Sequence, residues 1–456
     1  MDQPNILSNI VSSHTNQLQM FSKPESSLEK LDKLLIAFGS PLYIYNEQMI
    51  RNNAREFMNA FKSYIPNFKQ YFAVKATPNK YVMQILQDEG MGFDCSSLSE
   101  VELVGQLKCP SEIMYTSNYT SVDDFESVLC SIHEGIINCR HDTFPDIIIN
   151  LDDTDGLDNL CNAAKFTKLN LPEMISFRVN PAYGGTDSET SSNILGGRDT
   201  KFGIPDDKIV NAYRQAIDAG FTKFGIHVMA GSCVLDLKYF EELVNVVFNI
   251  INNIHKELNI TFEIINFGGG IGIAYTPDQQ DLNIDEVART IAVAIQKNKQ
   301  KYSITYDPII AMENGRYITG HFGWLVSKCK SIKRGYGDKT FYGLDACMAH
   351  LMRPGMYGAY HNITVPRLQN TESTNNVIFE KVNVVGSLCE NNDWFAKDRE
   401  LPVGIQKEDI FVIHDTGAHS FSMGFQYNGK LRSAEILLNS DDNAKLIRNA
   451  ETKCFN

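Results

Sequence analysis

One lysine follows an apolar run and could act as a nucleophile toward an aldehyde. Residues 71–74 are apolar and lead into Lys75, and Pro78 interrupts the chain shortly afterwards. This pattern predicts a buried strand, 69–75, that presents Lys75 at its carboxyl end. Such a lysine is either a surface side chain whose amine stays in water or a desolvated amine that forms a Schiff base with an aldehyde cofactor.

Glycines further along the chain could hold a phosphate. Three consecutive glycines, 268–270, follow an apolar stretch at 262–267, and Gly231-Ser232 follows another at 223–229. Consecutive glycines let backbone N–H groups approach an anion closely, and they adopt the positive φ that such loops need. A glycine run is equally common as a flexible turn.

A carboxylate and an arginine occur together after the apolar stretch 308–313. Arg316, three residues beyond Glu313, would supply a fixed cation for a phosphate. Glu313 is either a solvated strand end or the partner of a pyridinium N–H, which it would keep protonated. A Schiff-base lysine, a phosphate loop and a carboxylate for a ring nitrogen together describe a pyridoxal phosphate (PLP) site.

The elements that must position these residues alternate between strand and helix. Strands are predicted at 69–75, 91–95, 112–117, 135–139, 174–180, 223–229, 262–267 and 308–313, with amphipathic stretches such as 206–219, 237–258 and 284–299 between them. This α/β pattern predicts a (β/α)8 TIM-like barrel. An open doubly wound sheet is the alternative, but the absence of a clear switch point favours closure. In a barrel the glycine run would follow the seventh strand, where phosphates are often bound.

The pattern changes after about residue 322, and a C-terminal β domain is predicted there. Strand-like runs occur at 325–333, 340–344, 377–385 and 409–414. The predicted organisation is a mobile tail at 1–28, a segment at 29–46 that pairs with the β domain, a barrel at 47–322 and the β domain at 323–456. In the β domain, an arginine such as Arg353, taken alone, is more often a surface residue in an ion pair. A cysteine such as Cys389, taken alone, is more often a small buried apolar side chain.

Composition excludes several classes of protein. The 456 residues carry a net charge of −13, which argues against non-specific nucleic-acid binding. No apolar run approaches the length of a membrane helix, and the N-terminus lacks the pattern of a secretory signal. The ten cysteines contain no CxxC pair, so neither a metal site nor a disulfide framework is predicted, and a cytoplasmic location is expected.

The order of these residues resembles the PLP-dependent ornithine/diaminopimelate/arginine decarboxylase family, and most closely diaminopimelate decarboxylases. The resemblance extends from about residue 35 to 438 and consists of many ordered motifs. They are Ala73-Val74-Lys75, Gly92-Phe93-Asp94, Thr200-Lys201-Phe202-Gly203, Gly268-Gly269-Gly270, Glu313 to Arg316, Arg353-Pro354, Tyr357 to His361, Cys389-Glu390, 397–402 and Asp415 to Ala418. It implies an alanine-racemase-like barrel of PLP fold type III.

The resemblance also implies a role for each matching residue. Lys75 would hold PLP covalently, Glu313 would bond the pyridinium nitrogen, and Cys389 would return a proton from the neighbouring subunit. The implied cofactor-binding residues are Lys75, Asp94, His227, Met229, Gly231, Ser232, Gly268, Gly269, Gly270, Glu313, Arg316 and His419, and the substrate-binding ones are Arg316, Arg353, Tyr357 and Glu390. The implied reaction converts meso-diaminopimelate to L-lysine, in lysine biosynthesis, at active sites shared within a homodimer.

Three positions depart from the family pattern. Met229 stands where the family usually has a histidine stacked on the PLP ring. His227, two residues earlier on the same strand face, could partly substitute for it. His419 replaces a tyrosine that contacts the phosphate, and Asn314 replaces a proline. These changes alter stacking and phosphate contacts but leave the groups for cofactor attachment and protonation in place.

Other readings of the sequence remain open. A racemase on this barrel normally carries an arginine near the pyridine nitrogen, and Glu313 argues against it. A catalytically inactive regulator of the same fold is a second alternative, against which Lys75 and Cys389 argue. The third is a decarboxylase of another carboxyl-bearing substrate, such as a glutamyl or carboxy-polyamine derivative, which Arg353 would also fit.

Overall fold

The computed structural model describes residues 24–108, 112–133, 147–183, 195–369, 378–439, 441 and 443–453. This part of the chain divides into two compact units. The barrel unit comprises Ile50–Ile273 and Asp281–Ile318, and the β unit comprises residues up to Met49, Ala274–Gln280 and those from Thr319 onward. A short excursion, Ala274–Gln280, begins four residues after Gly270 and belongs with the β unit.

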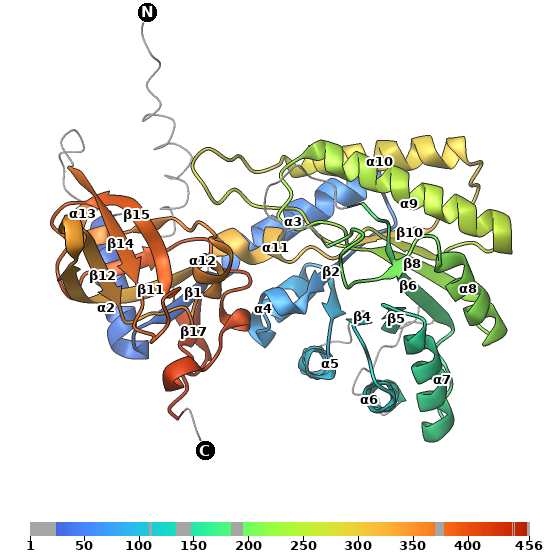
Figure 1. Ribbon diagram of the computed structural model, residues 1–456, viewed down its shortest axis with the longest axis horizontal. Coiled ribbons are helices and arrows are strands. Elements are labelled where there is room, and N and C mark those ends of the chain that lie inside the picture. The colour runs from blue at the N-terminus through green and yellow to red at the C-terminus, as the bar shows by residue number, and fades with distance from the viewer. Residues whose placement is uncertain are drawn as a thin grey trace, which may run out of the picture. The chain divides into compact units, whose positions relative to one another are not determined.

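The barrel unit is built on parallel strands that close on themselves (Figure 1). They are β2 (Phe68–Ala73), β3 (Gly92–Cys95), β4 (Ile113–Ser117), β5 (Ile147–Leu151), β6 (Met174–Asn180), β8 (Lys223–Val228), β9 (Ile264–Asn266) and β10 (Ile309–Met312). Closure occurs where β10 pairs with β2, with Ile310 opposite Phe68. The two-residue strand β7 (Ile204–Pro205) pairs with β6 beside this ring. The predicted (β/α)8 barrel is confirmed.

Helices precede, connect and follow these strands. They are α3 (Glu47–Tyr64), α4 (Lys80–Asp88), α5 (Leu98–Gly105), α6 (Val122–His133), α7 (Asp155–Thr167), α8 (Ile209–Asp218), α9 (Leu237–Leu258), α10 (Ile284–Lys301) and α11 (Arg316–Thr319). Figure 1 shows α9 and α10 side by side along the barrel. Side-chain caps begin several helices, because the first N–H groups of a helix lack partners within it. Asn283, for example, accepts from the N–H groups of Asp285 and Glu286 before α10.

The inside of the barrel is a packed core. Apolar residues from β2, β4, β5, β6, β9 and β10 meet there, namely Tyr71, Met114, Ile148, Met174, Ile264 and Ala311. Parallel strands covered by helices are buried on both faces, which explains why they read as continuous apolar runs in the sequence. A polar layer crosses the same interior, where Ser176 Oγ donates to Asn150 Oδ1 at 2.9 Å and Asn150 Nδ2 donates to Thr116 Oγ1 at 3.3 Å.

Two strand predictions need comment. The predicted strand 135–139 lies outside the described residues. The strand that pairs with β4 is β5, at Ile147–Leu151, which is absent from the prediction. Its three consecutive isoleucines, 147–149, are a β-branched signal that could have identified it. The first predicted strand was also too long, because β2 ends at Ala73 and Lys75 lies in a 3-10 turn, Val74–Ala76.

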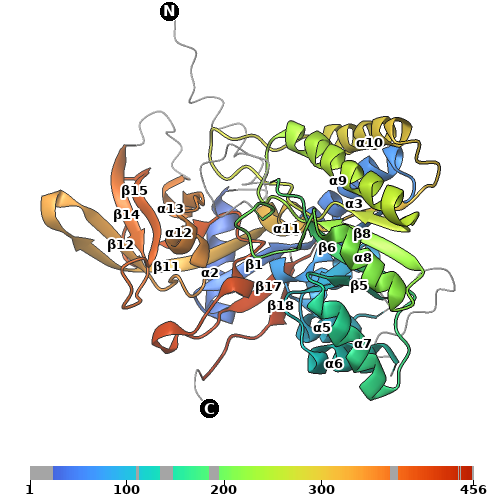
Figure 2. The same ribbon diagram turned by 45° about the vertical axis from the view of Figure 1, so that its right-hand side comes forward.

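The β unit contains a second, mixed sheet (Figure 2). Its strands are β1 (Leu42–Asn46), β11 (Gly323–Arg334), β12 (Thr340–Leu344), β13 (Ile363–Thr364), β14 (Phe379–Val385), β15 (Trp394–Pro402), β16 (Ile410–Ile413), β17 (Ala434–Leu438) and β18 (Ala444–Arg448), and its helices are α2 (Pro24–Phe38), α12 (Met352–Tyr357) and α13 (Pro366–Gln369). The N-terminal strand β1 runs antiparallel to β11 and parallel to β17. Leu31, Leu34 and Leu35 of α2 pack on this sheet in one apolar cluster.

The described residues contain neither a membrane-spanning helix nor a cluster of metal-ligating side chains. No helix there combines the length and apolar composition needed to cross a membrane. No group of three or more His, Cys, Asp or Glu side chains there is arranged to hold a metal ion.

Candidate active site

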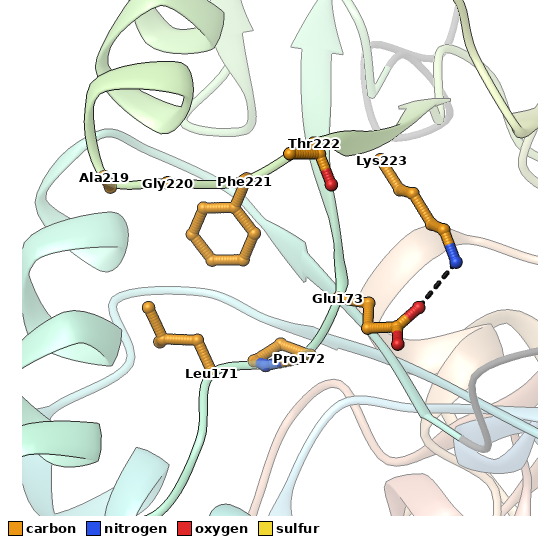
Figure 3. Close-up of a pocket in the computed structure, with 8 residues that line it drawn as sticks. All are labelled: Leu171, Pro172, Glu173, Ala219, Gly220, Phe221, Thr222 and Lys223. Carbon is orange, nitrogen blue, oxygen red and sulfur yellow. Dashed lines mark hydrogen bonds and ion pairs between the residues drawn. The ribbon is translucent and has the colours of Figure 1, made fainter.

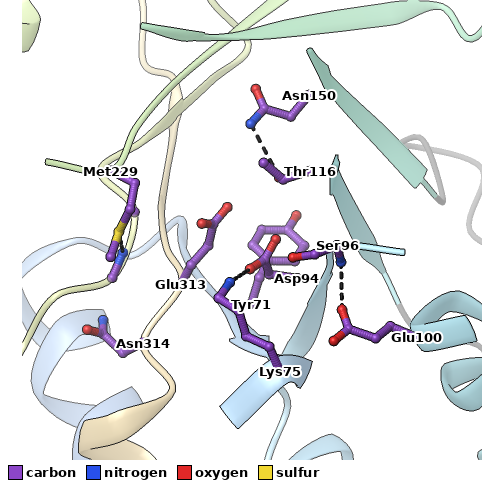
Figure 4. Close-up of polar contacts among 12 residues, drawn as sticks. Tyr71, Lys75, Asp94, Ser96, Glu100, Thr116, Asn150, Met229, Glu313 and Asn314 are labelled. Carbon is purple, nitrogen blue, oxygen red and sulfur yellow. Dashed lines mark hydrogen bonds and ion pairs between the residues drawn. The ribbon is translucent and has the colours of Figure 1, made fainter. Parts of the chain in front are cut away.

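Lys75 lies at the carboxyl end of the barrel strands, directly after β2. Its Nζ is 3.0 Å from Oδ2 of Asp94, which lies on the neighbouring strand β3 (Figure 4). Half of the Lys75 side chain (52%) is accessible to solvent, whereas Asp94 is buried. Desolvation lowers the pKa of the amine, but the carboxylates of Asp94 and Glu313 outweigh it, and the net pKa is raised. The amine is therefore reachable and, in the free chain, protonated.

Glu313 lies at the end of β10 and is held by two side chains. His227 Nε2 is 3.0 Å from Oε2, and Asn266 Nδ2 donates to Oε1 at 2.7 Å. Burial alone raises the pKa of the Glu313 carboxyl, but His227, Lys75 and the bond from Asn266 together hold it below its ordinary value. Glu313 therefore keeps its negative charge although its side chain is only 6% exposed.

Asp94 behaves in the opposite way. Burial and the neighbouring charge of Glu313 raise the pKa of its carboxyl, against the opposing effects of Lys75 and His227. Two carboxylates whose environments move their pKa values apart are suited to different tasks, one as a fixed charge and the other as a proton carrier. Within this cluster Glu313 is suited to the fixed charge and Asp94, 3.0 Å from the Lys75 amine, to proton transfer.

The glycine run follows β9 and packs against the ends of β8 and β10, the strands on either side of β9. A Cβ at Gly268 would lie 2.3 Å from the carbonyl oxygen of Val228, at the end of β8, and Gly268 has a φ of +67°. A Cβ at Gly269 would lie 2.6 Å from the carbonyl oxygen of Glu313. No side chain fits at either position. The N–H of Gly270 forms no hydrogen bond within the described residues, so the loop presents an open donor.

Met229, the first departure from the family pattern, is engaged with this loop. Its Sδ accepts from the N–H of Gly269 at 3.2 Å. His227 lies two residues earlier, and its ring contacts Glu313. Gly231 and Ser232 follow in the same loop, where a Cβ at Gly231 would lie 3.0 Å from the Tyr239 hydroxyl.

Asn314, another departure, connects the loops that follow β9 and β10. Its Oδ1 accepts from the N–H of Ile271 at 3.2 Å, immediately after the glycine run. Its backbone carbonyl accepts from Gln70 Nε2 of β2 at 2.9 Å. A proline at this position would have no side-chain acceptor for Ile271, so the asparagine adds a contact of its own. Arg316 follows at the start of α11.

The structure adds residues that the sequence reading did not assign to the site. Asn266 is one, because it bonds Glu313 and also accepts from the N–H of Gly268 at 2.8 Å. Arg178 on β6 is another, a buried side chain whose Nη1 is 3.6 Å from Oδ1 of Asp152. Both lie near the carboxyl ends of predicted barrel strands, and this position in the sequence could have identified them as site residues.

The remaining predicted site residues lie in the β unit. Arg353 on α12 is 7% exposed, and its Nη1 donates to His361 Nε2 at 2.7 Å. Tyr357 on the same helix is 44% exposed. Cys389 and Glu390 are exposed in the loop after β14, where the Cys389 N–H donates to Asn428 Oδ1 at 2.7 Å. His419 follows β16 with a φ of +57°.

A separate pocket lies at the opposite end of the barrel strands (Figure 3). It is lined by the segments that precede β6 and β8, Leu171–Glu173 and Ala219–Lys223. Lys223 Nζ and Glu173 Oε2 form an ion pair of 2.5 Å at its edge, between exposed side chains. Catalytic residues of (β/α)8 barrels occur at the carboxyl ends of strands, so this pocket is not the candidate active site.

The barrel residues fit PLP. The Lys75 amine can bind an aldehyde carbon, and Glu313 offers a charged, buried carboxylate to a pyridinium N–H. Each carboxylate oxygen accepts more than one hydrogen bond, so the contacts with His227 and Asn266 leave acceptor capacity on Glu313. The open N–H of Gly270 and the glycine backbone suit a phosphate.

A barrel with such a lysine and carboxylate defines the PLP-binding class of enzymes, and comparison with known proteins gives the family. The model of the pyridoxal-dependent decarboxylase family, pyridoxal binding domain, matches residues 48–320. The chain therefore belongs to the pyridoxal-dependent decarboxylase family.

Relatives and solved structures extend the similarity to the β unit. The chain is 36% identical to diaminopimelate decarboxylase of Methanothermobacter thermautotrophicus, over 91% of this chain and 90% of that protein. It is 37% identical to Protein TabA of Pseudomonas amygdali pv. tabaci, over 92% and 91%. The crystal structure of diaminopimelate decarboxylase from M. jannaschii in co-complex with L-lysine is 28% identical, covers 92% of each chain and has a TM-score of 0.78.

Proposed function

We propose that this protein catalyses the PLP-dependent decarboxylation of meso-diaminopimelate to L-lysine. The observation that carries the proposal is the buried carboxylate of Glu313, held by His227 and Asn266, in the same cluster as the solvent-accessible amine of Lys75. This arrangement is what an amino-acid decarboxylase needs, because a protonated pyridine nitrogen withdraws electrons strongly. The substrate assignment draws on the similarity to diaminopimelate decarboxylases along more than nine-tenths of the chain.

In the barrel, each residue of the cluster has a task. Asp94 Oδ2 takes the proton that the Lys75 amine must lose before it can bind the cofactor covalently. When bound, PLP supplies an electron sink for the electron pair that the departing CO2 leaves behind. Glu313 keeps its charge against the pyridinium N–H, and His227 and Asn266 hold Glu313 in place.

The phosphate-binding residues in the proposal are Gly231, Ser232, Gly268, Gly269, Gly270, Arg316 and His419. The glycines contribute backbone N–H groups, and Arg316 contributes charge. Met229 packs against the glycine loop through its sulfur and replaces the stacking histidine.

The β unit supplies the substrate-binding and protonating groups. We assign Arg353 and Tyr357 to a substrate carboxylate, Glu390 to the distal amine and Cys389 to the return of a proton. Cys389 and Glu390 are exposed in the single chain. This exposure supports a homodimer in which each chain completes the active site of the other. The free cysteines among the described residues support a reducing, cytoplasmic location.

A second candidate is decarboxylation of another amino acid that carries a second carboxylate. Met229 and His419 favour it, because both depart from the family pattern at the cofactor. The similarity to Protein TabA, at 37% identity, is as high as that to a diaminopimelate decarboxylase.

The test is release of CO2 by the purified protein with PLP, over meso-diaminopimelate, ornithine, arginine, lysine and glutamate. We expect release from diaminopimelate with L-lysine as the product, identified by chiral chromatography. Lys75→Ala should abolish release and the absorbance of covalently bound cofactor. Lys69→Ala is the matched control, because Lys69 lies on β2, the strand that leads to Lys75, but pairs with Glu112, 2.5 Å away. Release from another substrate in place of diaminopimelate would favour the second candidate.

A further inference from the structure

Arg353 is held by a cluster of side chains that lies entirely within the β unit. Its Nη1 donates to Nε2 of His361 at 2.7 Å, and both side chains are buried. Its guanidinium carbon lies 4.5 Å from the ring centroid of Tyr275. The Tyr275 ring in turn meets the His361 ring edge to face, with centroids 5.2 Å apart. Two rings thus fix one guanidinium.

The contacts of His361 determine its tautomer. Its Nδ1 lies 2.8 Å from the carbonyl oxygen of His414. A carbonyl only accepts hydrogen bonds, so Nδ1 carries the proton. Nε2 then carries a lone pair and can accept from Arg353, which has only donors. A neutral imidazole with this tautomer is therefore the form that binds Arg353.

His361 is itself anchored on its backbone side. Arg399 Nη1 donates to the His361 carbonyl at 2.8 Å. Pairing of β13 with β16 places Ile363 opposite Ile413, so the residues that flank His361 and His414 are joined by the sheet. His361 is 0% exposed, and both nitrogens of its ring are engaged in hydrogen bonds.

Tyr275 comes from the excursion Ala274–Gln280, five residues after Gly270. The excursion has a fixed shape, because Gln279 Oε1 accepts from the N–H of Tyr275 at 2.9 Å and from that of Thr276 at 3.2 Å. An aromatic face near a desolvated guanidinium stabilises it through the ring quadrupole. The ring that supports Arg353 therefore belongs to the same loop as the glycine run.

We infer that His361 and Tyr275 are positioning residues that fix the Arg353 guanidinium for a substrate carboxylate. The inference rests on the proposed function only in that Arg353 binds a carboxylate of the substrate. A guanidinium that binds a carboxylate in two places must be oriented in its plane, and misplacement lowers affinity without altering the chemistry. His361 acts through its Nε2 lone pair and Tyr275 through its ring face.

Two substitutions of His361 distinguish the role of Nε2 from that of Nδ1. His361→Gln places an amide where Nε2 lies and can still accept from Arg353. His361→Asn places an amide where Nδ1 lies, so it keeps a donor for the His414 carbonyl but offers Arg353 no acceptor. We expect His361→Asn to raise KM for diaminopimelate about tenfold or more with kcat changed less than about threefold, and His361→Gln to restore KM. Tyr275→Leu should raise KM, and Tyr275→Phe should not.

Two readouts do not depend on turnover. Pimelate, a dicarboxylate with the carbon skeleton of diaminopimelate, should bind the His361→Asn holoenzyme about tenfold more weakly than the wild type. Phenylglyoxal should label Arg353 faster in His361→Asn than in His361→Gln, as followed by peptide mass spectrometry. Asn383→Ala is the control for a lost buried polar group, because Asn383 lies on β14 and bonds Thr340 and Asp398.

Equal behaviour of the Asn and Gln variants, in KM and in labelling of Arg353, would overturn the inference. A fall in kcat at unchanged KM would also overturn it, because that pattern belongs to a catalytic or structural role. If the wild type releases no CO2 from diaminopimelate, the proposed function fails, and Arg353 labelling still decides whether His361 positions the guanidinium.

Discussion

Replacing Glu313 by glutamine removes one charge from the carboxyl end of the barrel and keeps the shape of the side chain. In the wild type, Asn266 Nδ2 donates to Glu313 Oε1 at 2.7 Å, and glutamine keeps an oxygen for this bond. Glutamine places an NH2 group at the position of Oε2, which contacts His227 Nε2. His227 can respond by carrying its proton on Nδ1, which is buried and forms no hydrogen bond within the described residues. The loss of stability should therefore be about 1–2 kcal/mol, the difference between a charge-assisted and a neutral hydrogen bond.

The loss of activity should be larger. Without the Glu313 charge the pyridine nitrogen is not held in its protonated form, and the electron sink is weakened. Removal of one preorganised electrostatic group from an active site typically lowers kcat about 10²- to 10³-fold, or about 3–4 kcal/mol. The catalytic loss therefore exceeds the stability loss, and the two can be measured separately.

The assay is initial-rate CO2 release by the PLP-saturated variant, with urea unfolding of the same preparation. Glu112→Gln is the matched control, because Glu112 accepts from Lys69 and Tyr71 at the other end of the barrel. A kcat of Glu313→Gln within about twofold of the wild type would refute the assignment of this carboxylate to the ring nitrogen. A large loss in Glu112→Gln as well would show that the effect is structural.

Three further predictions address other parts of the chain. Met229→His removes the sulfur that accepts from Gly269 but restores the residue usual in the family, so activity should persist and PLP affinity should change less than about tenfold; loss of PLP binding in absorbance titrations would contradict this. Burial lowers the pKa of His350 from 6.5 to about 4. The folded protein therefore binds fewer protons than the unfolded chain in this interval, and stability that is complete above pH 6.5 is lost as pH falls toward 4, by about 2–3 kcal/mol at pH 4.5. Urea unfolding at pH 7 and 4.5 should show a smaller decrease for His350→Gln, and equal decreases would be inconsistent with a buried neutral histidine. Equal mixing of Lys75→Ala and Cys389→Ser chains, each inactive alone, should restore about a quarter of wild-type activity if each active site takes one residue from each chain; no recovery after subunit exchange would argue against shared sites.

The barrel could be predicted from the sequence because its signals are local. Each strand is an apolar run and each helix has a 3.6-residue apolar period, and both are short-range properties of the chain. The strand 147–151 is absent from the prediction, although its isoleucines carry the same signal. The predicted length of the first strand was wrong because the 3-10 turn at Val74–Ala76 has no distinct apolar period.

The sequence also predicts Lys75, Glu313 and the glycine run as site residues, because residue type and position after an apolar run are enough to indicate their chemistry. The sequence does not predict that the pKa of Asp94 is raised while that of Glu313 is lowered. This difference depends on His227 and Asn266, 86 and 47 residues from Glu313 in the chain, and on burial of all four side chains. The closed sheet brings these strand ends together.

The cluster around Arg353 shows the same division. An arginine before a proline predicts nothing about its neighbours, and by itself it is more often a surface ion-pairing residue; only the family resemblance implies a substrate contact. The pairing of β13 with β16 and the return of Ala274–Gln280 to the β unit bring His361 and Tyr275 to it. The sequence by itself determined which residue types the site contains and which elements carry them. Only the tertiary structure decided their protonation and orientation, because both depend on burial and on contacts between residues far apart in the chain.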